Sequence, residues 1–340
     1  MTRGEAKALM WAGAGITALL GMQQMVRRSR RYDFRGRVVL ITGASRGLGL
    51  ILARLWAEEG ARLAICARDG EDLDTARREL STTAEVASFE CDIMHRADIE
   101  RMLREVEGEL GPVDVLVNNA GTIAVGPFET MTVEDFDDSL RTHFWGPLHA
   151  IQGVLPAMRE RGEGRIVNVS SIGGRIGVPH MAAYCAGKFA LTGFSQALRA
   201  ELLPHGICVT TVIPGLITTG SPRNAHFKGQ HEAEYAWFAA ADSMPGLAMD
   251  AEAAGREVVE AARYGEAEVI LGKAAELASL FNGVFPGLTA DLLSVAQRFL
   301  PSAEGGIGTE KALGSESESN VTQSPLTERT RRAEEKFNQR

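Results

Sequence analysis

The sequence has few cysteines and no excess of basic residues, and both absences narrow the range of functions. Its four cysteines lie far apart among 340 residues and form no Cys-x-x-Cys pair. Neither a zinc site nor a disulfide framework is therefore indicated, and a reducing compartment suits such cysteines. The formal net charge of −8 gives no overall basic field. We therefore expect a small-molecule ligand, with neither a metal ion nor a nucleic acid as partner.

One long hydrophobic run stands near the N-terminus. Residues 8–25 read ALMWAGAGITALLGMQQM and are followed by Arg27, Arg28, Arg30 and Arg31. Eighteen helical residues span roughly 27 Å, slightly less than the bilayer core, and the arginines favour the cytoplasmic side. We expect residues 1–31 to be a hydrophobic anchor and basic linker, with the rest of a membrane-associated chain in the cytoplasm. The alternatives are a surface or packed amphipathic helix and a secretory signal.

From residue 37 onward, short apolar runs alternate with longer helical patterns. Six strand–helix units begin at RVVLIT, RLAIC, VASFEC, VDVLV, RIVNVS and ICVTTV, and AEVIL near Val269 gives a seventh strand. Helices are expected to end near residues 59, 80, 109, 161 and 203. Strands that are apolar throughout are buried on both faces. The pattern therefore predicts a single α/β domain over residues 32–300, with about seven parallel strands and helices on each side.

Two segments interrupt this alternation. Residues 218–249 include Tyr235, Trp237 and Phe238, and insertions at such a place often close over substrates. We therefore expect a substrate loop there. Residues 301–340 are rich in Ser, Glu, Thr and Arg and have few large apolar side chains. Such a composition does not offset the entropy of ordering, so it predicts a disordered tail.

A glycine-rich loop joins the first predicted strand to the first helix. It reads TGASRGLG over residues 42–49, a Gly-x-x-x-Gly-x-Gly spacing. Glycines there let the backbone turn tightly and approach a pyrophosphate, whose charge then lies at the helix N-terminus. The position of the loop in the first unit predicts a dinucleotide site. The expected contacts from this loop are Gly43, Ser45, Arg46, Gly47, Leu48 and Gly49.

The end of the second strand indicates which dinucleotide is bound. NAD enzymes commonly place a carboxylate there against the ribose 2′-hydroxyl, whereas this chain has Ala67 followed by Arg68. Arg68 and Arg46 provide two cations where a 2′-phosphate would lie, and the donor fork of arginine suits a phosphate. We therefore predict NADP(H). The alternatives are that both arginines are ordinary surface charges and that Asp69 reaches a ribose.

Two later turns are expected to touch the cofactor as well. Asp92 follows the third strand and is placed to reach the adenine edge, while Asn119, Ala120 and Gly121 follow the fourth strand. Either segment could instead form a turn without touching a ligand.

The expected catalytic residues lie on a helix and at a strand end. Tyr184 and Lys188 fall in a helical pattern, and a spacing of four puts phenol and ammonium on one face. A free tyrosine has a pKa of about 10, which a nearby ammonium lowers, so Tyr184 could act as acid and base. Ser171 ends the fifth strand, where its hydroxyl could donate to a substrate oxygen. A Tyr-x-x-x-Lys pair alone usually lies on a solvated helix face, so the prediction also depends on Ser171 and the glycine-rich loop.

Together these residues resemble the short-chain dehydrogenase/reductase family over roughly residues 37–272. The resemblance implies a doubly wound, Rossmann-like sheet and the reduction of carbonyls or oxidation of alcohols without a metal. It implies Ser171, Tyr184 and Lys188 as the catalytic group, with Lys188 also holding the nicotinamide ribose. Hydride would pass between C4 of the nicotinamide and the substrate carbon while Tyr184 protonates the oxygen. The family also leads us to expect a homo-oligomer.

The same resemblance covers one more cofactor segment and includes one departure. Pro214, Gly215 and Thr219 resemble the family segment that touches the nicotinamide carboxamide. Family members usually carry an asparagine in the helix after the fourth strand, where it helps to hold a water molecule linking the lysine to solvent. This chain has His143 there. The histidine either joins the proton relay, since its ordinary pKa is about 6.5, or simply fills the space of the asparagine.

Two functions from different classes follow from these patterns. The first is a membrane-tethered, NADPH-dependent carbonyl reductase or alcohol dehydrogenase for an apolar, lipid-like substrate, as the N-terminal run, the aromatic segment and the amphipathic residues 288–300 suggest. The second is a nucleotide-binding regulator or scaffold without turnover, and the intact Ser171, Tyr184 and Lys188 argue against it. A related chemistry on the same fold, such as epimerisation or dehydration, would be separated by product analysis.

Overall fold

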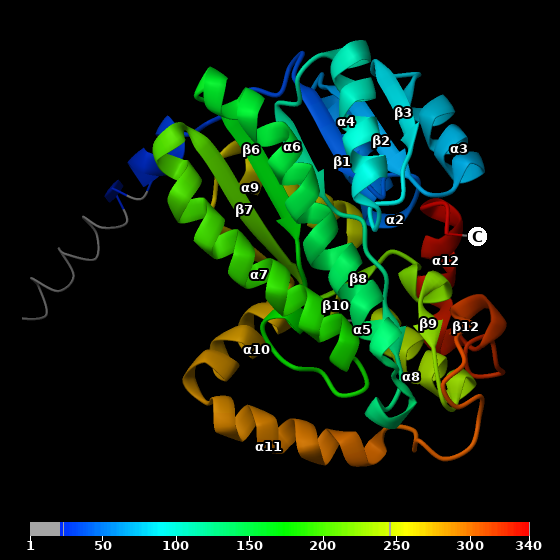
Figure 1. Cartoon of the computed structure of the whole chain (residues 1–340). Helices are drawn as coiled ribbons and strands as arrows, with labels where there is room; N and C mark the ends of the chain where they lie inside the picture. Colours follow the sequence, from blue (N-terminus) through cyan, green and yellow to red (C-terminus); the bar gives the residue numbers. More distant parts are fainter. Residues whose placement is uncertain (1–20, 23, 245, 340) are drawn as a thin grey trace, which may run out of the picture.

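The computed structural model describes residues 21, 22, 24–244 and 246–339 (Figure 1). At its centre is a seven-stranded sheet with the order β11-β7-β6-β4-β1-β2-β3, in which all neighbouring strands are parallel. The strands are β1 Val38–Thr42, β2 Arg62–Ala67, β3 Val86–Glu90, β4 Val115–Asn118, β6 Gly164–Val169, β7 Ile207–Pro214 and β11 Glu268–Leu271. The chain leaves β1 toward one edge and returns on its other side at β4. This is the doubly wound, Rossmann-like α/β domain that the sequence predicted.

Helices cover both faces of this sheet. One face packs against α2 Gly47–Glu58, α3 Gly70–Leu80 and α9 Ala251–Arg263, and the other against α4 Arg96–Leu110, α6 Gly146–Arg161 and α7 Ala182–Leu202. Successive strand residues serve opposite layers: Val39 and Ile41 belong to the first core, Val38 and Leu40 to the second. Because both sets are buried, each central strand has to be apolar along its whole length.

The helix expected to end near residue 161 is interrupted. It consists of α5 Val133–Leu140, a single π-helical turn over Arg141–Trp145, and α6. Thr142 and His143, both buried, lie in the π-helical turn. Such turns often occur at functional sites, because the extra residue re-aims the side chains next to it.

The segment expected to be a substrate loop, residues 218–249, is largely regular structure. It contains β9 His226–Phe227, α8 His231–Ser243 and the start of β10 Ala248–Asp250, which pairs with β8 Leu216–Thr218. Tyr235 and Phe238 pack with Phe227 in a third apolar core. The described part of this segment is therefore packed against the rest of the domain. Beyond β11, α10 Lys273–Val284 and α11 Pro286–Ala296 run along the outside of the molecule (Figure 1).

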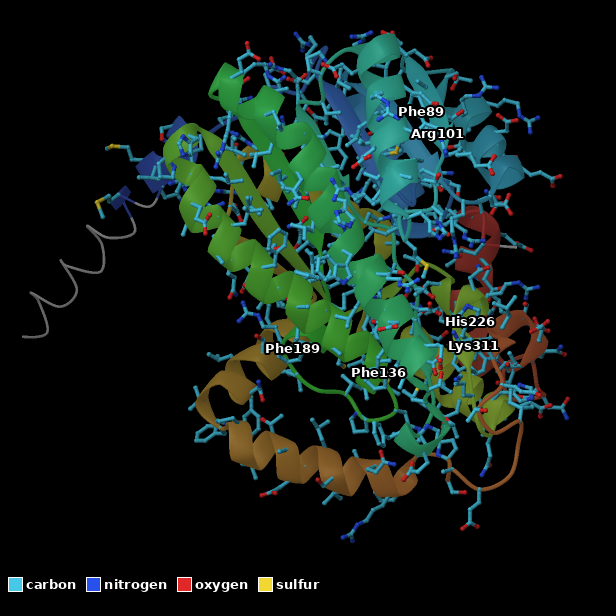
Figure 2. All side chains as sticks on the ribbon, in the orientation of Figure 1. Phe89, Arg101, Phe136, Phe189, His226 and Lys311 are labelled. Atoms are coloured by element: carbon cyan, nitrogen blue, oxygen red, sulfur yellow. The ribbon has the colours of Figure 1, made fainter. Side chains whose placement is uncertain are left out.

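The expectation of a disordered tail over residues 301–340 was wrong for the residues that the structure describes. Residues 301–339 turn back across the molecule. There, β12 Ala312–Leu313 pairs with β9, which also pairs with β5 Ala124–Val125, and α12 Glu328–Lys336 packs against α8 (Figure 1). Lys311 lies beside His226 (Figure 2) and is ion-paired to Asp135 and Asp138 at 3.1 and 3.0 Å.

Two apolar residues explain why this polar segment is ordered. Ala333 and Phe337 are four residues apart, so they share a helix face, and they are only 6% and 3% exposed. Both belong to the core cluster that contains α2 and α9. Lys336 is ion-paired to Glu252 of α9 at 2.6 Å. The average composition of residues 301–340 did not predict this order, because a few apolar residues at the right spacing are enough when they pack into an existing core.

Most of the expected N-terminal anchor, residues 1–20 and 23, lies outside the described residues. In the described part of the chain, no helix has both the length and the apolar character needed to cross a bilayer. The basic linker packs on the domain: the Arg27 guanidinium donates to Glu266 at 2.8 Å, and the Tyr32 backbone N–H donates to the Arg263 carbonyl.

Candidate active site

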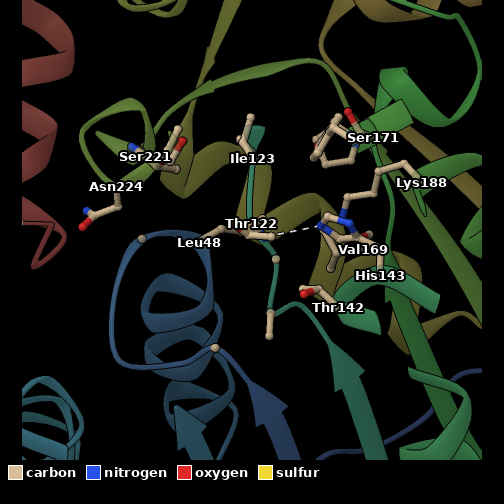
Figure 3. A pocket seen from close by; sticks show the side chains of 18 of the residues that line it. Leu48, Thr122, Ile123, Thr142, His143, Val169, Ser171, Lys188, Ser221 and Asn224 are labelled. Carbon is tan, nitrogen blue, oxygen red and sulfur yellow. Dashed lines mark hydrogen bonds between the residues drawn. The ribbon is translucent and has the colours of Figure 1, made fainter. Parts of the chain in front are cut away.

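A cavity of about 1150 Å³ opens at the carboxyl ends of the parallel strands (Figure 3). The segments that follow β1, β2, β3, β4, β6 and β7 line it, which is where a doubly wound sheet presents its ligand crevice. All the predicted site residues, from the glycine-rich loop to Thr219, lie on its wall. The structure therefore brings together in one cavity residues that are up to 176 positions apart, Gly43 and Thr219 being the extremes.

The glycine-rich loop lies tightly against the end of β4. A Cβ on Gly49 would fall 2.0 Å from the Gly43 carbonyl oxygen, and one on Gly43 would fall 2.8 Å from the Cα of Ala120. The Asn119 side-chain amide donates to the carbonyls of Thr42 and Gly43 at 3.0 and 3.1 Å. The loop then runs into α2, whose first turn carries no acidic residue. This close-packed loop with a helix N-terminus at its end fits the pyrophosphate of a dinucleotide.

Asn119 and Asp92 both line the cavity and both hydrogen-bond to the local backbone, so each combines a place at the cofactor site with a role in a turn. Asn119 lines the cavity, but its amide serves the backbone of the loop, so it acts as a brace for the cofactor site. The Asp92 carboxylate accepts the N–H of Met94 at 2.9 Å, which forms a turn, and the residue also faces the cavity.

The charged residues near the end of β2 separate into a structural carboxylate and two cations. Asp69 accepts the N–H groups of Glu71 and Asp72, each at 3.0 Å, and so caps α3. The exposed Arg68 lines the cavity. Arg46, on the same wall, donates to Asp72 at 3.3 Å. Both backbone bonds to Asp69 go to Oδ1, so one oxygen of its carboxylate caps α3, and the alternative in which the other oxygen reaches a ribose stays open.

The predicted catalytic residues meet at the end of β6. Ser171 caps a short helical turn and accepts the N–H of Gly173 at 3.0 Å. Its side chain also shares a hydrogen bond with Tyr184. Lys188, one helical turn after the tyrosine, is buried, and its Nζ donates to the Val169 carbonyl at 2.8 Å. The Lys188 Nζ lies 5.7 Å from the centre of the Tyr184 ring. Phenol, hydroxyl and ammonium therefore share one side of the cavity.

The protonation of this group is dominated by burial. Burial raises the pKa of Tyr184 to about 12, while the hydrogen bond with Ser171 lowers it. Burial also lowers the pKa of Lys188 to about 7. The lowering of the tyrosine pKa expected from Lys188 does not prevail, since the pKa of Tyr184 lies above its ordinary value of 10. The reason is physical: the same low-dielectric surroundings disfavour both the phenolate and the ammonium that would stabilise it.

His143 is fixed in its neutral form. Its Nε2 accepts the N–H of Thr122 at 3.4 Å, shown as a dashed line in Figure 3, which leaves Nδ1 to donate toward Ser139 Oγ at 3.2 Å. Burial, and then the charge of Lys188, hold the pKa of His143 well below 6.5. The ring lies edge-on to that of Tyr184. These contacts favour the reading in which the histidine fills the space of the family's asparagine.

Sequence reasoning missed part of the cavity wall. Gln339, Lys311 and Leu313 line it, and all three come from the segment that was expected to be disordered. The available signal was the spacing of Ala333 and Phe337 in a segment otherwise poor in apolar residues. Among the described residues, no group of three or more His, Cys, Asp or Glu is arranged to hold a metal ion.

Comparisons with known proteins agree with this site. The family model for short chain dehydrogenases matches residues 37–228. The chain is 35% identical over 198 residues to a 3-ketodihydrosphingosine reductase of Bacteroides thetaiotaomicron, an alignment that covers 57% of this chain and 70% of that protein.

Solved structures of short-chain dehydrogenases have the same fold as this chain. A short-chain dehydrogenase from Streptomyces avermitilis superposes with a TM-score of 0.65 and 31% identity, over 77% of this chain and 97% of that one. A metagenomic short-chain oxidoreductase in complex with NADP superposes with a TM-score of 0.58 and 29% identity, over 71% of this chain and 98% of that one. Family model, sequence and fold converge with the cavity geometry, and the chain belongs to the short-chain dehydrogenase/reductase family.

Proposed function

We propose that the protein is an NADP(H)-dependent oxidoreductase that interconverts a carbonyl and a secondary alcohol on an apolar, lipid-like substrate. The observation that carries this proposal is that Ser171, Tyr184 and Lys188 share one cavity with the glycine-rich loop. Membrane association through the N-terminal run, with the domain in the cytoplasm, and assembly into a homo-oligomer are further parts of the proposal. Fractionation of cells that express the full chain tests the membrane association.

In the proposed reaction, a bound nicotinamide supplies or accepts the hydride, and the chain's own residues control the oxygen and its proton. With a pKa of about 12, Tyr184 is protonated at neutral pH and is ready to donate to an oxygen that gains negative charge. Ser171 offers a second hydroxyl to the same oxygen. Lys188, with a pKa of about 7, exchanges a proton near neutral pH and can supply the proton that replaces the one given up by the phenol. These protonation states support reduction of a carbonyl; the reverse oxidation needs the Tyr184 phenolate, which burial disfavours.

The preference for NADP(H) is supported by the charges around the end of β2. Arg46 and Arg68 lie on the cavity wall, whereas the carboxylate of Asp69 caps α3. We expect Arg46→Ala and Arg68→Ala each to raise the KM for NADPH by about 10- to 100-fold, the worth of one charge-assisted hydrogen bond. The KM for NADH should change much less, because NADH has no 2′-phosphate. Equal losses for the two cofactors in steady-state assays would contradict the preference.

An apolar substrate is supported by the wall next to Tyr184. The third apolar core includes Met181 and Phe238, and Val178, Trp237 and Tyr184 itself pack against it. The Trp237 indole N–H donates to Glu234 at 2.7 Å, so its polar atom points away from any ligand. The resemblance to a 3-ketodihydrosphingosine reductase is consistent with a long-chain ketone.

The experiment that tests the function measures NADPH oxidation with long-chain 3-keto lipids and with small polar ketones. We expect turnover of the long-chain compounds, and a loss of at least ~100-fold in kcat for Tyr184→Phe, which removes the proton donor. Circular dichroism of that variant serves as the folding control. NADPH that stays unconsumed across the panel would refute the oxidoreductase, and turnover confined to small polar ketones would refute the lipid-like substrate.

A further inference from the structure

The last residues of the described chain are built into the glycine-rich loop. The Phe337 carbonyl accepts the N–H of Gly47, the first residue of α2, at 2.8 Å, and the Asn338 amide donates to the Ser45 carbonyl at 3.0 Å. A Cβ on Gly47 would fall 2.4 Å from Nε2 of Gln339. The C-terminal segment therefore bonds to the backbone that is expected to receive the cofactor phosphates.

A chain of hydrogen bonds connects this segment to one of the two predicted phosphate-binding arginines. The Asn224 side-chain amide donates to Gln339, at 2.9 Å to the main-chain oxygen and 2.7 Å to Oε1. The Arg46 guanidinium in turn donates to Asn224 Oδ1 at 3.2 Å. All three side chains face the cavity. Gln339 thus holds Asn224, and Asn224 holds Arg46.

The segment is anchored firmly enough to act as a support. Phe337 is buried in the core cluster of α2 and α9, so the contact with the loop follows from packing of the domain itself. On α12, Thr330 donates to the Asp242 carboxylate of α8 at 3.1 Å and bonds Ser243 at 2.6 Å. A loosely held inhibitory peptide would lack a buried aromatic anchor of this kind. The same short segment therefore joins the cofactor loop to the wall of the substrate cavity.

We propose that residues 327–339 are a clamp for the cofactor site, in which Gln339 is a positioning residue that holds Arg46 ready for the 2′-phosphate of NADP(H). This inference depends on the proposed cofactor and adds that recognition of its 2′-phosphate needs the C-terminal segment. Because the effect passes through Arg46, it acts on NADPH and leaves NADH nearly untouched. Because it passes through one hydrogen-bonded chain, Asn224→Ala removes the whole link to Arg46, whereas Gln339→Ala removes the bond to Oε1 and keeps the bond to the main-chain oxygen.

The test measures the Kd of NADPH and of NADH by the nucleotide's fluorescence on titration with the full-length protein. Asn224→Ala should raise the Kd of NADPH about 3- to 10-fold and Gln339→Ala about 2- to 5-fold, with a change of less than about twofold for NADH in both. The double variant should lose little more than Asn224→Ala alone, since coupled sites are not additive. Arg332→Gln is the matched control, because the side chain of this residue is 78% exposed and pairs with Glu328 one turn earlier on α12. It should bind both nucleotides like the parent.

The possible results separate the two proposals. Gln339→Ala should melt at the temperature of the parent, so a weaker Kd cannot be attributed to unfolding. An unchanged or tighter Kd for NADPH, equal losses for both nucleotides, or fully additive losses in the double variant would overturn the clamp. A parent protein that binds neither nucleotide would overturn the proposed function instead.

Discussion

His143 lies against the ring of Tyr184, with 5.4 Å between ring centres, but it is not free to exchange protons. Because its pKa is held well below 6.5, it stays neutral across the pH range in which Lys188 titrates. We therefore expect His143→Asn to keep kcat/KM within about threefold of the parent and to leave the pH–rate profile between pH 6 and 9 unchanged in shape. A limb of the profile that shifts or disappears would show that the histidine does take part in the relay.

The control for this prediction is His143→Ala. It removes a buried ring, so it should destabilise the fold by about 2–4 kcal/mol in denaturant titrations. That loss has a structural cause and separates packing from proton transfer. If His143→Asn proved as unstable as His143→Ala, the asparagine would not fill the space of the histidine.

At this same scale, the identity of the site residues could be predicted better than their electrostatics. The spacing of Tyr184 and Lys188 is local, so a helix fixes it regardless of the rest of the chain. Their pKa values depend on how deeply the fold buries them, and burial works against the shift expected for Tyr184. Likewise, Asp69 could be placed near the ribose from sequence, but its use as the cap of α3 is a detail of backbone geometry.

Among the elements, α10 and α11 stand out because their apolar side chains remain exposed. Leu288 and Leu292 of α11 are 51% and 53% exposed, although the pattern of residues 288–300 is amphipathic. We expect Leu288→Ser and Leu292→Ser each to lower the free energy of unfolding by less than about 1 kcal/mol, since little apolar area is lost. Leu50→Ala in α2, where the side chain is 1% exposed, should cost about 2–5 kcal/mol.

Urea titrations of the three variants, at a concentration at which the parent is monomeric, give the comparison. Serine variants as unstable as Leu50→Ala would mean that this face of α11 is covered in the folded protein.

The alternation of strands and helices was predictable because it depends on the local periodicity of apolar residues. The π-helical turn at His143 and the ordering of α12 were not, because both depend on contacts between residues distant in sequence.

For the molecule as a whole, the C-terminal segment closes the fold over a buried carboxylate. Asp242 of α8 is 3% exposed and accepts the hydroxyl of Thr330 from α12. Burial raises its pKa from 3.8 to about 7, while Thr330 and Arg329 lower it and Glu334 raises it further. The folded protein thus keeps Asp242 protonated at a pH where the unfolded chain has released the proton. Two distant parts of the sequence meet at a group whose charge depends on pH.

The sign of the resulting pH dependence follows from this raised pKa. The stabilisation is complete below the unfolded pKa of about 4 and is lost as the pH rises through about 7, because the carboxylate must then be buried as an anion. Asp242→Asn stays neutral and escapes this loss. We therefore expect the variant to gain on the parent by on the order of 1–4 kcal/mol between pH 5 and pH 8. Thermal melts of both proteins at the two pH values measure the gain, and a difference in Tm that is independent of pH would place the titrating carboxylate elsewhere.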